Sequence, residues 1–187
     1  MIVRTMAMIA ALAAAASAAA LEVEGVRLAD KATVGGQELS LNGAGTRKRA
    51  IFKVYVGSLY LPAKARSAQE VLAKSPRRIQ LNMLRNLSAD QLIGALTDGL
   101  KQNTTPAELS AIAVQTGEMA AIMKSFGQAK EGSVVTLDFI GASTVIGLDG
   151  TPRGTIEGAA FGDALTRIWV GEHPAQDDLK KALLGGA

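Results

Sequence analysis

The sequence predicts an α+β fold in which a mainly antiparallel sheet is covered on one face by helices. Stretches in which apolar and polar residues alternate, typical of half-buried strands, occur near both ends of the chain. Three helix-start signals lie in succession between them. Strands and helices are therefore grouped along the chain instead of alternating, which favours an antiparallel sheet over a parallel one.

The region up to residue 62 is predicted to form strands. Alternation predicts the first strand, and a high content of β-branched and aromatic residues predicts the longest one. Glycine-containing dipeptides mark the turns between them. The predicted strands are residues 21–26, 37–41 and 50–61, with turns at Gly35-Gly36 and Asn42-Gly43 and an end at Pro62.

Three capping boxes predict the starts of helices, because in each one a hydroxyl side chain stands three residues before Glu or Gln. Pro106, at the first helical position, strengthens the third signal. The pairs are Ser67 with Glu70, Ser88 with Gln91 and Thr105 with Glu108. They predict helices over residues 67–74, 88–101 and 105–126, and an alternating strand over 78–85.

A β-meander and two helices are predicted after Gly127. Alternation predicts the strands, and Asp149-Gly150 is a strong hairpin signal. The first of the two helices has an apolar side that carries Trp169. The predicted strands are residues 133–140, 143–148 and 154–157, and the predicted helices are 159–170 and 177–184.

Composition excludes several classes of function. The chain has 187 residues, 48% of them apolar, which predicts one globular domain over residues 21–187. It has no cysteine and a single histidine, so disulfides, thiol nucleophiles and multi-histidine zinc sites are excluded, and we expect no metal and no cofactor. A net charge of +3 with few aromatic residues argues against nucleic-acid binding.

Residues 1–20 are predicted to be a secretory signal peptide that precedes the fold. Arg4 supplies a positive start, an uncharged apolar run follows, and small residues lead up to a cleavage point after Ala18 or Ala20. The run is too short for a comfortable membrane span of about 20 residues. We therefore expect a periplasmic or secreted protein with no stable membrane span after cleavage.

Two motifs that suggest familiar chemistry lack the required context. The glycine-rich stretch 43–47 has no third glycine and leads into a strand, so it does not predict a dinucleotide site. His173 is followed by Pro174 and no GxSxG sequence exists, so we expect a surface histidine and no serine hydrolase.

Arg47 is the candidate anchor for an anionic ligand. It belongs to a basic cluster in which Lys48 and Arg49 are expected to be solvated turn residues. If a strand runs unbroken from Arg47, the even spacing places Tyr55 on the same sheet face, with Ile51 between them. A guanidinium beside apolar strand residues is a ready receptor for a carboxylate or phenolate.

Four blocks of the sequence carry a resemblance to a known family. They are GAGTR (43–47), FKVYVGSLYL (52–61), LNMLRNLS (81–88) and VGEH (170–173). Their order and spacing resemble the chalcone isomerase family, specifically its bacterial chalcone isomerase-like branch, over about residues 21–184. The resemblance implies an open-faced sandwich with a lipophilic cleft between sheet and helices.

The resemblance also implies site residues. In plant chalcone isomerases a cleft arginine guides a phenolate into attack on an enone, and the GAGTR match places that arginine at Arg47. The other polar positions of those enzymes fall at Tyr55, Leu92 and Gly99 and near Ile168, where only Tyr55 keeps a hydroxyl. Non-catalytic relatives hold a fatty-acid carboxylate with an arginine and a tyrosine, and the pair of Arg47 and Tyr55 resembles that arrangement more closely.

Three functions remain open on the sequence. The leading one is an exported protein that binds a small lipophilic carboxylate or phenolate through Arg47, Tyr55, Leu92, Gly99 and Ile168. The second is an isomerase, an intramolecular lyase of the chalcone isomerase type with Arg47 and Tyr55 as catalytic residues, acting on an unknown enone. It would need a polar acid or base beside Arg47, and the sequence offers Asn82 on the neighbouring strand. The third is a non-catalytic envelope scaffold with a filled cleft.

Overall fold

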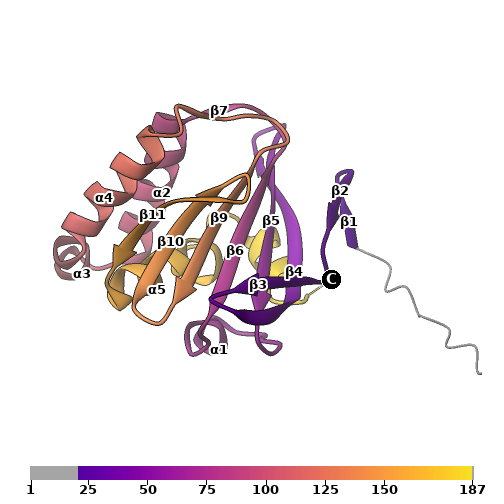
Figure 1. The fold of residues 1–187 in the computed structure, drawn as a ribbon, viewed down its shortest axis with the longest axis horizontal. Coiled ribbons are helices and arrows are strands. Elements are labelled where there is room, and N and C mark those ends of the chain that lie inside the picture. Colours follow the sequence, from indigo (N-terminus) through magenta and orange to yellow (C-terminus); the bar gives the residue numbers. More distant parts are fainter. Residues whose placement is uncertain (1–20, 187) are drawn as a thin grey trace, which may run out of the picture.

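A seven-stranded antiparallel sheet forms the centre of the fold (Figure 1). The structure is a computed structural model, and it describes residues 21–186. The strand order is β11-β10-β9-β6-β5-β4-β3, and each neighbouring pair is antiparallel. The strands are β3 (Lys31–Val34), β4 (Gln37–Arg49), β5 (Phe52–Leu61), β6 (Arg77–Met83), β9 (Val134–Ile140), β10 (Ser143–Leu148) and β11 (Thr151–Glu157).

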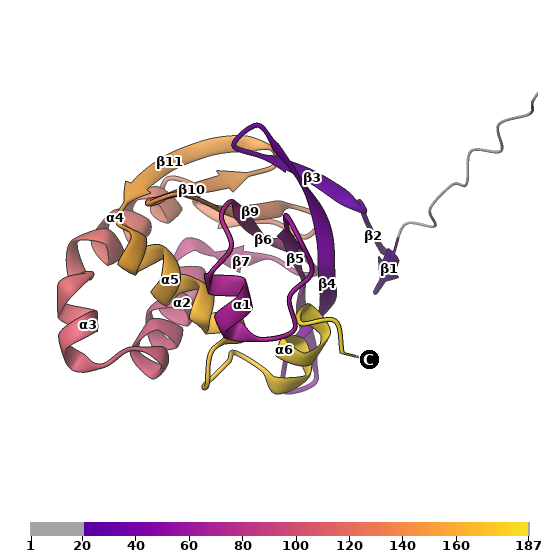
Figure 2. The same ribbon diagram turned by 90° about the horizontal axis from the view of Figure 1, so that it is seen from below.

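The helices lie on the inner side of the curled sheet, so the predicted α+β class with one covered face is confirmed (Figure 2). Helices α2 and α5 pack against each other, and α6 packs on β4. The helices are α1 (Ala68–Leu72), α2 (Ala89–Asn103), α3 (Pro106–Ala111), α4 (Ala113–Lys124), α5 (Ala159–Val170) and α6 (Asp177–Leu183). Two short antiparallel strand pairs lie outside the main sheet: β1 (Leu21–Val23) with β2 (Val26–Leu28), and β7 (Leu87–Ser88) with β8 (Gln128–Ala129).

Alternation along the strands decides which face is covered. On β6, Ile79, Leu81 and Met83 are buried in the main core. Arg78, between them in sequence, points to the other face and pairs with Asp138 of β9, with Nε–Oδ1 and Nη2–Oδ2 distances of 2.5 and 2.6 Å. The period of two along each strand therefore separates the helix-covered face from a more polar outer face.

All three capping boxes form helix starts. The Ser67, Ser88 and Thr105 side chains each accept from the backbone N–H three residues later. The predicted single helix over 105–126 is wrong, because Ile112 (φ −105°, ψ 14°) separates α3 from α4. Its side chain is buried in the core, so tertiary packing overrides the continuous helical pattern.

Three strand predictions also need correction. Residues 21–26 form a hairpin, not one strand, because Glu24 and Gly25 adopt positive φ and reverse the chain. Strand β4 does not end at Asn42 but continues to Arg49, with a register shift between Leu41 and Gly43. The predicted strand over 50–61 begins only at Phe52. The four-residue strand β3 was not predicted at all.

Candidate functional site

A cavity of about 850 Å³ lies between one end of the sheet and helices α2 and α5. All five residues predicted for the ligand site line it, although they come from four separate elements: Arg47, Tyr55, Leu92, Gly99 and Ile168. The wall is mostly apolar, with charged side chains near its opening. Its apolar lining includes Val54, Leu81, Leu87, Ala95, Leu96 and Ala175.

Arg47 and Tyr55 reach the same sheet face by a route that differs from the predicted one. The chain turns at Ala50, which has φ +52°, so Arg47 of β4 and Tyr55 of β5 are directly opposed antiparallel partners. Opposed residues point to the same face of a sheet. Ile51, expected between them on that face, lies in the turn and is 88% exposed.

Gln176, the residue before α6, binds the end of β4 that carries Arg47. The Gln176 side-chain oxygen accepts a hydrogen bond from the Lys48 backbone N–H at 2.8 Å and one from Arg47 Nη1 at 3.3 Å. Arg47 Nη1 also donates to the Lys48 carbonyl. These contacts use one terminal nitrogen of the guanidinium, which has further N–H groups to offer a ligand.

Tyr55 and Trp169 join the two walls of the cavity. The indole Nε1 of Trp169, on α5, donates a hydrogen bond of 3.0 Å to the Tyr55 hydroxyl oxygen. Because the oxygen accepts this bond, the hydroxyl hydrogen is left to donate to another acceptor. The pair therefore supplies a neutral donor close to the cationic Arg47.

Comparison with known proteins identifies the family and the fold. A sequence model of the family described as chalcone isomerase-like matches residues 20–185. The chain belongs to the chalcone isomerase-like family. A fatty-acid binding protein of Arabidopsis thaliana has a similar fold, with a TM-score of 0.65 over 86% of this chain and 92% of that chain, at 13% identity. No curated protein sequence matches the chain.

Burial keeps the site tyrosine of this chalcone isomerase-like chain protonated. Removal from water raises the pKa of the Tyr55 phenol above its ordinary value of 10.0, and this outweighs the lowering by the Trp169 hydrogen bond and the Arg47 charge. Tyr55 is thus a hydrogen-bond donor near neutral pH, not a phenolate base.

Both tyrosines of the chain are expected to lose their protons at a higher pH than an ordinary tyrosine does. Burial also raises the pKa of Tyr60, on the outer face, and the sequence holds only these two. The folded state keeps protons that the unfolded state loses, so the free energy of unfolding should fall as pH rises above about 10. Near-ultraviolet absorbance should show no tyrosinate below that pH while the chain is folded. Ordinary titration of the folded chain would contradict this expectation.

Leu92 and Ile168 serve the core as well as the cavity. They are 5% and 3% exposed and belong to the main hydrophobic cluster. Gly99 allows α2 to approach α5, because a Cβ atom added there would lie 2.8 Å from Cγ2 of Ile168. Gly99 therefore contributes backbone to the wall where the two helices meet.

Two glycines of α2 should respond in opposite directions to alanine. Gly94→Ala should raise the free energy of unfolding by about 0.5–1 kcal/mol, because no atom lies within 4 Å of the added Cβ. Gly99→Ala should lower it by about 1 kcal/mol, because Ile168 is β-branched and buried and cannot easily move aside. Urea unfolding of the two variants measures both values. Equal shifts would mean that α2 and α5 are not in close contact at Gly99.

The acid or base sought beside Arg47 is not supplied by Asn82. Its backbone opposes Val56 in the sheet, and its side chain accepts a hydrogen bond of 2.9 Å from Gln80, on the face away from the helices. The carboxylates that line the cavity, Asp90 and Asp98, are exposed residues of α2. The prediction that Asn82 could serve the site is therefore wrong.

Sequence reasoning missed three contributors to the site. Trp169 was expected only on the apolar side of its helix, and its indole N–H contact could not be read from periodicity. Gln176 carries no motif, and it meets β4 only through the docking of α6. Arg85 lines the cavity and stacks on Phe52, with its guanidinium carbon 4.7 Å from the ring centre.

A second arginine on the helix-covered face has a structural role. Arg77, 5% exposed, donates to Asp163 at 2.7 Å, to Thr166 at 3.1 Å and to the Lys74 carbonyl at 3.1 Å. Burial lowers its pKa, and the Asp163 carboxylate opposes that shift. Protein groups occupy its donors, which distinguishes Arg77 from Arg47.

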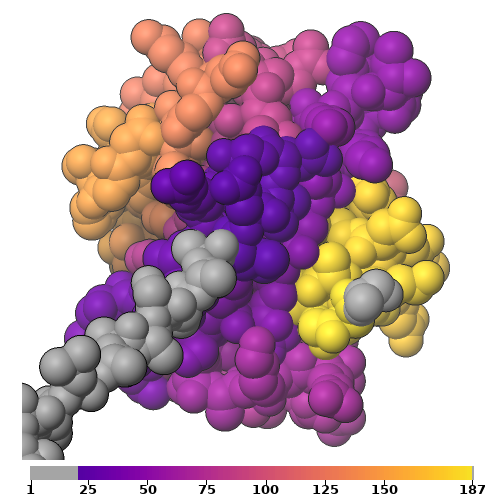
Figure 3. All heavy atoms as spheres, turned by 90° about the vertical axis from the view of Figure 1, so that its right-hand side faces the viewer, coloured from indigo at the N-terminus to yellow at the C-terminus, as the bar shows by residue number. Residues whose placement is uncertain are grey.

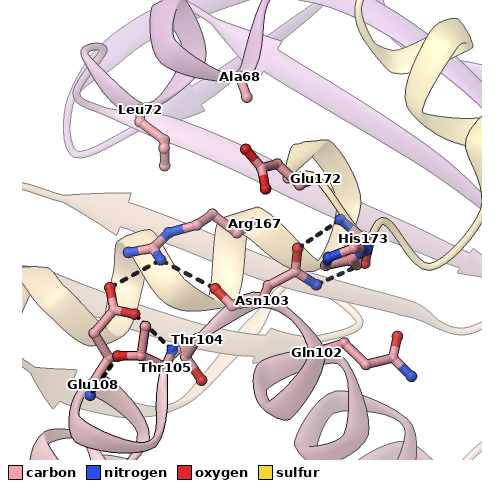
Figure 4. Close-up of a pocket in the computed structure, with 11 residues that line it drawn as sticks. Ala68, Leu72, Gln102, Asn103, Thr104, Thr105, Glu108, Arg167, Glu172 and His173 are labelled. Carbon is pink, nitrogen blue, oxygen red and sulfur yellow. Dashed lines mark hydrogen bonds and ion pairs between the residues drawn. The ribbon is translucent and has the colours of Figure 1, made fainter.

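A second cavity, of about 530 Å³, is lined by polar groups that bind one another (Figure 4). Arg167 donates to the Asn103 carbonyl at 3.1 Å and to Glu108 at 3.2 Å. The Asn103 amide donates to the His173 carbonyl at 2.7 Å. The His173 side chain is exposed, as expected from the sequence.

The described part of the chain contains neither a membrane-spanning helix nor a metal-binding cluster. Within residues 21–186 no helix is long and apolar enough to cross a membrane. The same residues contain no group of three or more histidine, aspartate or glutamate side chains arranged to hold a metal ion. The predicted signal peptide, residues 1–20, lies outside the described residues.

Proposed function

We propose that the protein binds a small lipophilic carboxylate, such as a fatty acid, or a lipophilic phenolate in the cavity between the sheet and α2. The observation that carries the proposal is the meeting of Arg47 and Tyr55 at a mostly apolar wall. Arg47 pairs with the anionic group, Tyr55 donates a hydrogen bond to it, and the apolar tail lies along Leu92 and Ile168.

The chemistry of the site favours binding over isomerisation. Ring closure of an enone would be helped by a group that moves a proton near the reacting atoms. Burial holds Tyr55 in its neutral form, and Asn82 belongs to the other face. The likeness to a fatty-acid binding protein supports the same choice.

Trp169 provides a direct measurement, because it is the only tryptophan of the chain and lines the cavity. Titration with oleate should change its fluorescence with saturation at one equivalent. Methyl oleate, which has no negative charge, should bind much more weakly, because Arg47 then has no anionic partner. Equal binding of acid and ester would refute anchoring by Arg47.

Tyr55→Phe is expected to weaken oleate binding by about 1.5–3 kcal/mol, the contribution of a hydrogen bond to a charged group. Tyr60→Phe is the matched control, because Tyr60 is also buried but packs with Val34 and Leu39 in the separate cluster on the outer face. The same fluorescence titration measures both variants. Equal losses in the two would mean that Tyr55 acts only through stability.

We also propose that residues 1–20 direct export and are then removed, on the basis of their charged start, apolar run and small residues. The mass of the protein recovered from the periplasm or medium should correspond to a chain that begins at Ala19 or Leu21. A full-length chain retained in the cell would contradict this part of the proposal.

A further inference from the structure

The turn between β4 and β5 exposes apolar side chains among positive charges. Ile51 and Phe52 are 88% and 53% exposed, and they are neighbours in sequence. Residues 47–53 contain Arg47, Lys48, Arg49 and Lys53 and no acidic residue. The turn stands out from the body of the molecule as the violet projection at the upper right of Figure 3.

This turn also forms part of the cavity opening. Arg49 and Phe52 from the turn and Arg85 from the segment after β6 are exposed residues that line the cavity. The Arg85 guanidinium stacks on the Phe52 ring. A surface that contacts the turn therefore also lies next to the entrance.

The nearby acidic side chains do not cancel the positive charge. Glu24, from the β1–β2 turn, is ion-paired with Lys53. Asp90 and Asp98 of α2 both line the cavity, and Asp98 lies about two helical turns further along α2 than Asp90. Glu131 lies beside Asn86, to which its backbone N–H donates at 2.8 Å. Lys48, Arg49 and Arg85 remain exposed cations around Ile51 and Phe52.

We propose that the β4–β5 turn docks the cavity opening onto an anionic lipid bilayer, with Ile51 and Phe52 in the interface and Lys48, Arg49 and Arg85 facing the lipid headgroups. Exposed apolar side chains flanked by Lys and Arg bind an anionic membrane, because the apolar groups are buried in its interface and the cations are attracted to its headgroups. The role in exchanging a lipophilic acid rests on the function proposed above, because such a ligand resides in membranes.

A bilayer fits this surface better than a protein partner does. A stable protein interface buries about 800 Å² on each side and needs a fitted patch of some 20 residues. The turn offers two neighbouring apolar side chains on a projection. A membrane needs no complementary shape, and its affinity is the sum of apolar burial and charge attraction.

The test is flotation of the full chain with vesicles of phosphatidylcholine, alone or mixed with phosphatidylglycerol. We expect binding to the mixed vesicles and its loss in high salt, because attraction to the headgroups is screened. Ile51→Ser should lower the partition coefficient about tenfold through lost apolar burial. Lys48→Gln should lower it about fivefold. Neither residue lines the cavity.

Matched controls are available on α4. Val114 is 72% exposed and Lys124 is exposed, and both lie on a different element. Val114→Ser and Lys124→Gln should leave vesicle binding unchanged. Binding through residues 1–20 would be equal in all variants, so equal partitioning of Ile51→Ser and Val114→Ser would overturn the proposal. Failure of the wild type to bind mixed vesicles would also overturn it. So would a result in which Ile51→Ser reduces self-association of the chain and leaves vesicle binding unchanged.

Oleate titration without vesicles separates this proposal from the function on which it rests. Ile51→Ser should bind oleate with unchanged affinity but take it up more slowly from mixed vesicles. Oleate binding without vesicle binding would overturn the docking proposal alone. Vesicle binding without oleate binding would overturn the proposed ligand and leave the docking surface established.

Discussion

Arg47→Ala is expected to weaken oleate binding about 100-fold or more, because the anion loses a charge-assisted, two-pronged partner beside an apolar wall. The free energy of unfolding should change by less than about 1 kcal/mol. Arg47 bonds only to the Lys48 carbonyl and Gln176 in the described structure, and both lie near the surface. Fluorescence of Trp169 measures the affinity, and urea unfolding measures the stability.

Arg153→Ala is the matched control, because Arg153 is an exposed arginine on the edge strand β11. It should bind oleate like the wild type. Native mass spectrometry of protein purified from cells should show a co-purified lipophilic acid in the wild type and in this control but not in Arg47→Ala. An Arg47→Ala variant that does not fold would show that Arg47 is structural and that the site assignment is wrong.

Gly43→Ala is expected to lower the free energy of unfolding by about 3 kcal/mol. A Cβ atom at Gly43 would overlap the backbone oxygen of Ala182 and lie 2.8 Å from that of Leu183. Both oxygens belong to the backbone of the last turn of α6, and backbone atoms cannot rotate away as a side chain can. Displacing α6 also removes Gln176 from Arg47, so oleate affinity should fall as well.

Gly117→Ala provides the control for this substitution. Gly117 lies within α4, and no atom is within 4 Å of its added Cβ. Alanine has less conformational freedom than glycine in the unfolded chain. The substitution should therefore raise the free energy of unfolding by about 0.5–1 kcal/mol. Urea unfolding measures both variants. A Gly43→Ala variant as stable as the wild type would mean that α6 does not pack closely on β4.

The glycine-rich stretch shows why spacing alone identifies a motif poorly. Gly43 and Gly45 resemble the start of a nucleotide-binding loop, and the missing third glycine excluded that role. The structure supplies the reason for them: α6 lies so close to β4 that side chains at both positions would collide with it. That contact joins segments more than 130 residues apart, and no local pattern reveals it.

The sequence by itself determined the order of the longer strands and of the helices, every helix start except that of α4, and the covering of one sheet face by helices. These properties depend on hydrophobic period and capping chemistry, which act over a few residues. Where the prediction was wrong, as at Ile112 and Asn42, a buried side chain in tertiary contact overrode the local preference. Asn42 illustrates this, because its side chain bonds Ala65 and Leu183 while β4 continues through it.

Only the tertiary structure decided how the site is assembled. Arg47 and Tyr55 share a face through strand pairing, not through one continuous strand, and Trp169 and Gln176 join them from α5 and the start of α6. The exposed turn at Ile51 likewise exists because Ala50 reverses the chain. Residues distant in sequence meet through hydrogen-bonded register and helix docking, and these depend on the whole fold rather than on any local stretch of chain.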